Sequence, residues 1–105
     1  MRQFCAFHNP NPATRAAIPL LLEVQSELIA DLGTAVVVPL CAVHAFQGKP
    51  IKTLTPILEI DGKDYVMLTP QLAGVARKHI GQKVADLSHR RDAIIAALDL
   101  LITGI

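Results

Sequence analysis

The sequence has few of the residues on which nucleic-acid binding depends. It contains no tryptophan, aromatic residues make up 4% and charged residues 18% of its 105 residues, and 10 basic side chains nearly balance 9 acidic ones. Binding DNA through its phosphates needs a clear basic excess, and binding single-stranded nucleic acid uses aromatic rings on which bases stack. The composition therefore argues against a protein that binds nucleic acid directly.

Long hydrophobic runs are also missing. The most apolar stretch, residues 35–46, is interrupted by Pro39 and His44 and is shorter than the roughly 18–20 residues of a membrane-spanning helix. The first residues soon reach the polar string NPNP at residues 9–12, so they lack the apolar core of a signal peptide. We therefore expect a cytoplasmic protein with no membrane partner.

Signatures of catalysis and metal binding are absent as well. The two cysteines, Cys5 and Cys41, form no Cys-x-x-Cys motif and have apolar neighbours, which predicts reduced thiols in the core. No two histidines are three or four residues apart, so no metal site is expected. Neither Ser26 nor Ser88 lies in a Gly-x-Ser-x-Gly motif, and no glycine cluster could hold a phosphate. We therefore expect neither an enzyme nor a cofactor.

What the sequence does contain is a series of short apolar runs with turn signals between them. Runs of strand length cover residues 3–8, 18–25 and 35–42, and Asp61-Gly62 between two further runs predicts a β-hairpin. Two of the runs contain a proline, Pro19 or Pro39, so we expect edge, kinked or bulged strands there. Short strands followed by one terminal helix predict a mostly-β fold, a small β-barrel with a C-terminal helix, as a single domain over residues 1–105.

The tail, from Asp86 onwards, has the pattern of a helix with an unusually wide apolar face. Asp86 or Ser88 can serve as its N-cap. Its apolar residues cover an arc of about 220°, whereas a surface helix needs little more than about 100°. Such a helix needs cover on two sides. This predicts either a homodimer, with Leu98 and Leu101 in the interface, or barrel strands that wrap the helix within one subunit.

Four strings stand out along nearly the whole chain. They are EVQSELI at residues 23–29, VVPL at 37–40, IGQKVADLSHR at 80–90 and the terminal Gly104-Ile105. In order and in spacing they resemble the CcdB family of toxins. The resemblance implies an SH3-like β-barrel with a C-terminal helix, assembled as a homodimer. It also implies the toxin of a type II toxin–antitoxin system of the plasmid-maintenance kind, neutralised by a CcdA-like antitoxin.

Members of that family poison DNA gyrase. The resemblance therefore implies a protein that binds the gyrase A subunit and traps the enzyme on cleaved DNA, without chemistry of its own. Operator DNA would be read by the antitoxin, with the toxin as co-repressor, and the antitoxin would contact the loops at residues 9–13 and 45–52. The implied gyrase-facing surface comprises Leu28, Ile29, Asp99, Ile102, Thr103, Gly104 and Ile105.

Five positions depart from the familiar pattern, and three of them, Arg91, Asp92 and Ala96, differ from its polar helix face. Asp99 stands where the family has Asn, and Thr103 stands where the well-known gyrase poisons carry Trp. These departures keep a second interpretation open, a weakly toxic or non-toxic relative that acts as antitoxin partner and co-repressor. A third interpretation is an RNA-cleaving toxin of the MazF kind on the same barrel, which would need a general base and a cation at the scissile phosphate.

Overall fold

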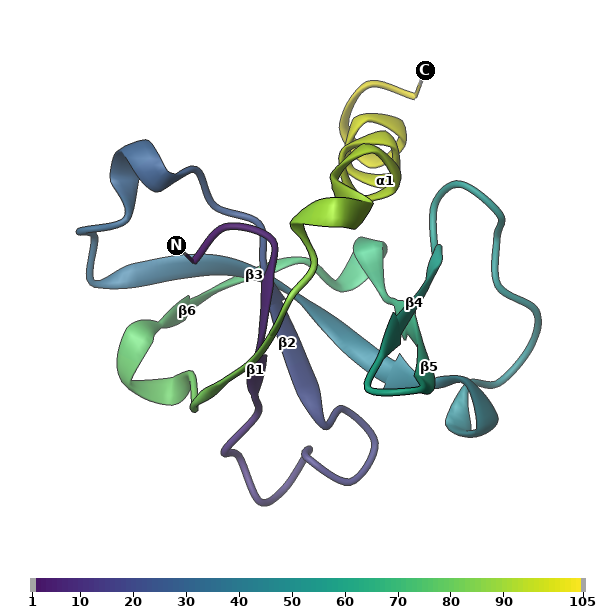
Figure 1. Cartoon of the computed structure of the whole chain (residues 1–105), viewed down its shortest axis with the longest axis horizontal. Helices are drawn as coiled ribbons and strands as arrows, with labels where there is room; N and C mark the ends of the chain where they lie inside the picture. Colours follow the sequence, from purple (N-terminus) through teal and green to yellow (C-terminus); the bar gives the residue numbers. More distant parts are fainter. Residues whose placement is uncertain (1, 105) are drawn as a thin grey trace.

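The structure, a computed structural model, describes residues 2–104 and contains one antiparallel β-sheet and one α-helix (Figure 1). The strands follow the order β4-β5-β3-β2-β1-β7, and β6 pairs with β3 beside this path. The sheet curls into a half-barrel, and the helix α1 packs on it near the C-terminus. The strands are β1 (Cys5–His8), β2 (Leu20–Glu23), β3 (Thr34–Ala42), β4 (Ile57–Ile60), β5 (Lys63–Met67), β6 (Ala73–Ala76) and β7 (Lys83–Asp86), and α1 covers Arg91–Thr103.

This architecture confirms the predicted fold class, mostly β with a C-terminal helix. The predicted hairpin is confirmed as well: β4 and β5 pair in register from Ile57↔Val66 to Ile60↔Lys63. The turn residues Asp61 and Gly62 have φ of 52° and 78°. Two consecutive positive φ angles define the type I′ turn, whose twist matches that of the flanking strands.

The prediction that the two proline-containing runs form edge strands is wrong, and of the two prolines only Pro39 lies within a strand, since Pro19 precedes β2. β2 lies between β1 and β3, and β3 pairs with β2 on one side and with β6 and then β5 on the other. The Val36 carbonyl accepts the backbone N–H of Val24, which directly follows β2. The Pro39 carbonyl accepts the backbone N–H of Leu68, on the opposite side of β3. The nitrogen of Pro39 thus faces the gap where β3 changes partner from β6 to β5, and no ladder hydrogen bond is lost.

The C-terminal helix begins later than the sequence predicts. Residues 83–86 form β7, which pairs with β1 through Ala6↔Ala85 and Cys5↔Asp86. The Asp86 carboxylate does accept a backbone N–H, from Ser88 at 2.8 Å, but it caps a 3-10 turn over Ser88–Arg90 that precedes α1. Pairing with β1 therefore takes up Asp86, one of the two predicted N-caps, and the other, Ser88, lies in the 3-10 turn, so that Arg90 is the N-cap of α1.

The core lies between the sheet and α1. The register brings Ala6, Leu22 and Val38 side by side on one face of the sheet, and all three are fully buried. Ile94 and Ala97 of α1 pack into the same cluster. Burial of these aliphatic side chains, at about 25 cal/mol per Å² of apolar surface, fixes the helix on the sheet.

Both cysteines are buried and neither forms a disulfide, as predicted. Burial raises the pKa of the thiols of Cys5 and Cys41 above the ordinary value. Because the thiolate is the reactive form, a raised pKa keeps these groups unreactive at neutral pH. Within residues 2–104, no helix has both the length and the hydropathy needed to cross a membrane.

Candidate functional site

The segment between β2 and β3 carries three exposed apolar side chains. It contains a 3-10 turn, Glu27–Ile29, with Ser26 as its N-cap. The Ser26 hydroxyl accepts the backbone N–H of Leu28 at 3.1 Å. Leu28 is 94% exposed, Ile29 47% and Leu32 51%. We call these three residues the apolar tip. Several large apolar side chains exposed in one short segment are typical of a surface that binds a partner.

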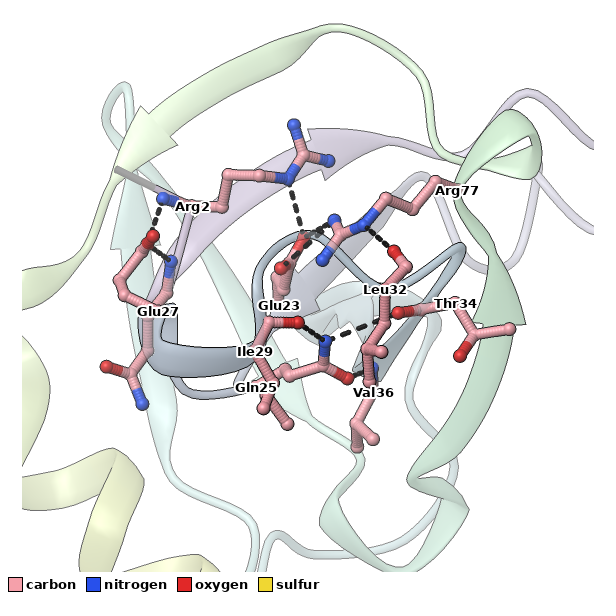
Figure 2. Close-up of polar contacts among 10 residues, drawn as sticks. Arg2, Glu23, Gln25, Glu27, Ile29, Leu32, Thr34, Val36 and Arg77 are labelled. Atoms are coloured by element: carbon pink, nitrogen blue, oxygen red, sulfur yellow. Dashed lines mark hydrogen bonds and ion pairs between the residues drawn. The ribbon is translucent and has the colours of Figure 1, made fainter.

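The N-terminal residues hold the start of this segment through Glu27 (Figure 2). The Glu27 carboxylate accepts the backbone N–H of Gln3 at 2.6 Å and also that of Arg2. These two hydrogen bonds favour the ionised form and lower the pKa of Glu27 below its ordinary value. The 3-10 turn is therefore tied to the chain entering β1.

The buried side chain of Gln25 links the segment between β2 and β3 to the start of β3. Its side chain is buried, and its amide nitrogen donates to the carbonyls of Ile29 at 3.0 Å and Thr34 at 3.2 Å. Its amide oxygen accepts from Val36 N–H at 3.1 Å. One buried amide thus satisfies backbone groups on both sides of the loop, which an apolar side chain could not do.

Glu23 is the buried charge of this region. It is 1% exposed, and its carboxylate pairs with Arg2 Nε at 3.2 Å and Arg77 Nη1 at 3.3 Å. A buried carboxylate needs such partners because its desolvation is expensive. Sequence analysis missed this network, although an acidic residue inside the apolar run LLLEV at residues 20–24 is a signal for it.

The end of α1 forms the second exposed apolar feature. Ile102 is 73% exposed, and Asp99, Thr103 and Gly104 are exposed around it. Gly104 ends the helix with φ of 76° and donates its N–H to the Leu100 carbonyl at 3.1 Å. Glycine adopts this left-handed conformation without strain, so the chain turns sharply at the helix end.

The two exposed features both lie in the upper part of Figure 1, the turn that carries the apolar tip at the upper left and the end of α1 to the right of centre. The loop after β1 lies at the lower edge of the view. Six of the seven residues assigned by resemblance to the gyrase-facing surface are exposed in these two features. The seventh, Ile105, lies outside the described residues.

The residues assigned to a dimer interface are half-buried within their own chain. Leu98 packs against the core cluster, and Leu101 keeps part of its surface exposed. The sheet therefore covers one side of the wide apolar arc of α1 through Ile94 and Ala97, which are fully buried. The side that carries Ile102 has no cover from residues 2–104.

A groove lies on the face of the sheet opposite to α1, beside the loop after β1. Its volume is about 690 Å³, and Ile18, Leu21, Pro39 and Val75 form its apolar floor. Asn9 orders the loop that borders it, since its side-chain amide donates to the Thr14 hydroxyl at 3.0 Å and the Ile18 carbonyl at 2.8 Å. This loop includes residues 9–13, which the resemblance assigns to antitoxin contact.

The chemistry that the described residues offer is recognition. Between residues 2 and 104, no three histidine, cysteine or acidic side chains are grouped as metal ligands. The distinguishing features are instead exposed apolar groups on backbone that side-chain hydrogen bonds hold. A comparison with protein-family models matches residues 3–104 to the model described as CcdB protein. Since that match covers nearly all of the 105 residues, the chain belongs to the CcdB family of toxins from toxin–antitoxin systems.

Proposed function

We propose that this protein is the toxin of a type II toxin–antitoxin system and poisons DNA gyrase by binding its A subunit and trapping the cleaved DNA–gyrase complex. Family membership supports the target. The observation that carries the proposal is the apolar tip, where Leu28 is 94% exposed on a segment that hydrogen bonds from Gln25 and Arg77 hold in place. A partner that covers the tip and Ile102 removes apolar surface from water, which favours binding.

The assembly that we propose is a homodimer of single CcdB-like toxin domains, each spanning residues 1–105. The partly exposed side of α1, with Leu98 and Leu101 at its margin, supports an interface between two copies. A CcdA-like antitoxin would bind the loops at 9–13 and 45–52, and the ordered loop beside the groove supports the first of these contacts. The pair would co-repress its operon, with operator DNA bound by the antitoxin, in the cytoplasm where gyrase acts.

A weakly toxic or non-toxic member of the family is the second candidate, and Thr103 favours it. Its side chain is small, and its hydroxyl is used in a bond to the Asp99 carbonyl. Such a protein would still bind the antitoxin and act as co-repressor. Poisoning strength separates the two candidates.

The test is gyrase-dependent DNA cleavage, titrated with the purified protein and stopped with detergent to reveal trapped complexes. We expect wild type to increase linear DNA and Leu28→Ala to need at least tenfold more protein for the same effect. Ile57→Ala is the matched control, because Ile57 is an exposed aliphatic residue of β4, 42% exposed, outside the proposed surface. Absence of cleavage with wild type would contradict poisoning, and equal titration of Leu28→Ala would contradict the proposed surface.

A further inference from the structure

The apolar tip is held at its far end by one side chain from a distant part of the chain. Arg77 lies in the 3-10 turn Arg77–His79 after β6. Its Nε donates to the carbonyl of Leu32 at 2.7 Å, across 45 residues of sequence. Its backbone N–H donates to the adjacent Gly33 carbonyl at 3.0 Å. Two consecutive carbonyls at the end of the segment therefore depend on this one residue.

The same guanidinium also reaches the start of the segment (Figure 2). Nη1 of Arg77 lies 3.3 Å from both carboxylate oxygens of Glu23, the last residue of β2. Figure 2 shows Arg77 between the Glu23 carboxylate and the Leu32 carbonyl. The planar fork of arginine suits this task because its N–H groups point in fixed directions toward two acceptors at once. Arg77 thus bridges the two ends of the loop that carries the tip.

We propose that Arg77 is a positioning residue for gyrase binding, and that it acts by holding Leu32 and the rest of the apolar tip in the conformation that the partner binds. The inference rests on the proposed function. Leu32, 51% exposed, becomes a third contact residue beside Leu28 and Ile29. A loop that is ordered before binding loses little conformational entropy when the partner docks, so its contacts contribute fully to affinity.

A direct contact between Arg77 and gyrase is a different explanation. The Arg77 side chain is 21% exposed and uses both Nε and Nη1 within its own chain. The positioning role therefore predicts that affinity and loop order change together, whereas a contact role predicts a loss of affinity with the loop unchanged.

The experiment compares Arg77→Lys and Arg77→Met in the full-length protein. Arg77→Lys keeps a positive charge beside Glu23 but loses the planar fork, so it remains informative if Arg77→Met fails to fold. Arg15→Lys is the matched control, because Arg15 is exposed in the loop after β1, at the lower edge of Figure 1. Affinity is measured by surface plasmon resonance against the purified gyrase A subunit. Amide hydrogen exchange is measured by mass spectrometry for residues 26–33 and for the β4–β5 hairpin.

We expect both Arg77 variants to exchange at least tenfold faster over residues 26–33, with the hairpin unchanged, and to bind gyrase at least tenfold more weakly. Leu32→Ala should weaken binding without faster exchange, and Arg15→Lys should match wild type in both readouts. Weaker binding of Arg77→Lys with unchanged exchange would overturn the inference in favour of direct contact. Unchanged binding with faster exchange would overturn it because loop order would then not matter. Failure of wild type itself to bind gyrase would instead defeat the proposed function on which the inference rests.

Discussion

The hydroxyl of Thr103 donates a hydrogen bond to the carbonyl oxygen of Asp99 at 2.6 Å, within the last turn of α1. A threonine hydroxyl commonly bonds the carbonyl four residues back in a helix. The side chain is thereby turned toward its own backbone, and the exposed helix end presents Ile102 as its large apolar group. The end of α1 therefore presents less apolar surface than it would with an aromatic residue at position 103.

Thr103→Trp is expected to strengthen gyrase poisoning. A buried indole removes about 150–250 Å² from water, and an aromatic side chain at the centre of an interface contributes about 2–4 kcal/mol. The concentration that gives half-maximal trapped cleavage complex should therefore fall at least tenfold. Thr103→Ala is the control for loss of the hydroxyl bond. Equal potency of Thr103→Trp and wild type would mean that the helix end is not in the contact surface.

Leu101→Lys is expected to dissociate the proposed homodimer. Sedimentation of wild type at micromolar concentration should give about twice 11.3 kDa, and the variant should sediment as a folded monomer because an unpaired charge in an apolar interface costs several kcal/mol. Leu98→Lys should unfold the chain instead, since Leu98 packs against its own core. A wild-type monomer would contradict the dimer, as would a dimeric Leu101→Lys.

Gly81→Ala is expected to destabilise the fold by about 1–3 kcal/mol, as overpacking does. An added Cβ would lie 2.8 Å from the His8 carbonyl oxygen and 3.0 Å from the His8 Cβ. Gly81 also donates its N–H to that carbonyl at 2.9 Å, so the two backbones cannot separate without loss of the bond. The measurement is the free energy of unfolding in urea.

Gly74→Ala is the matched control for this prediction. Gly74 lies in β6, where an added Cβ meets nothing within 4 Å. We expect Gly74→Ala to leave stability unchanged or to raise it by about 0.5 kcal/mol through the unfolded state. If both variants unfold at the same urea concentration, the close approach of Gly81 to His8 does not affect the free energy of unfolding.

The stability of the fold is expected to fall in mild acid, in part through Glu27. Its hydrogen bonds from Gln3 and Arg2 lower its pKa below the ordinary 4.5. A group with a lowered folded-state pKa stabilises the protein above its unfolded pKa, and this contribution disappears as pH falls through the folded value. The free energy of unfolding of wild type, measured in urea, should therefore fall as the pH drops below about 4.5. Glu27→Gln should show a shallower decline over the same window, and an identical decline would show that Glu27 does not contribute.

Asp86 contributes to the same acid transition in a second region. The backbone N–H of Ser88 lowers the pKa of the Asp86 carboxyl below 3.8. Protonation of Asp86 should therefore release the turn before α1 as the pH falls below about 3.8. Glu27→Gln is therefore expected to remove only part of the decline, because Asp86 still titrates in the variant.

Local chemistry determined several parts of this protein from the sequence alone. Asp61-Gly62 predicts the hairpin because few dipeptides accept positive φ twice in succession. The apolar runs at 3–8, 18–25 and 35–42 become β1, β2 and β3 because their side chains suit a buried sheet. The family strings, spread over residues 23–105, identify the family because they keep their order and spacing.

Tertiary structure alone decided the rest. β3 is central despite Pro39 because two strands meet it at different points and leave the proline nitrogen at the gap between them. Residues 83–86 became a strand because β1 offered an unpaired edge. Glu23 and Arg77, 54 residues apart, meet only once the sheet has folded. Local sequence patterns report backbone preference and amphipathicity, whereas partner choice, buried charge pairing and the order of an exposed loop depend on contacts between segments far apart in the chain.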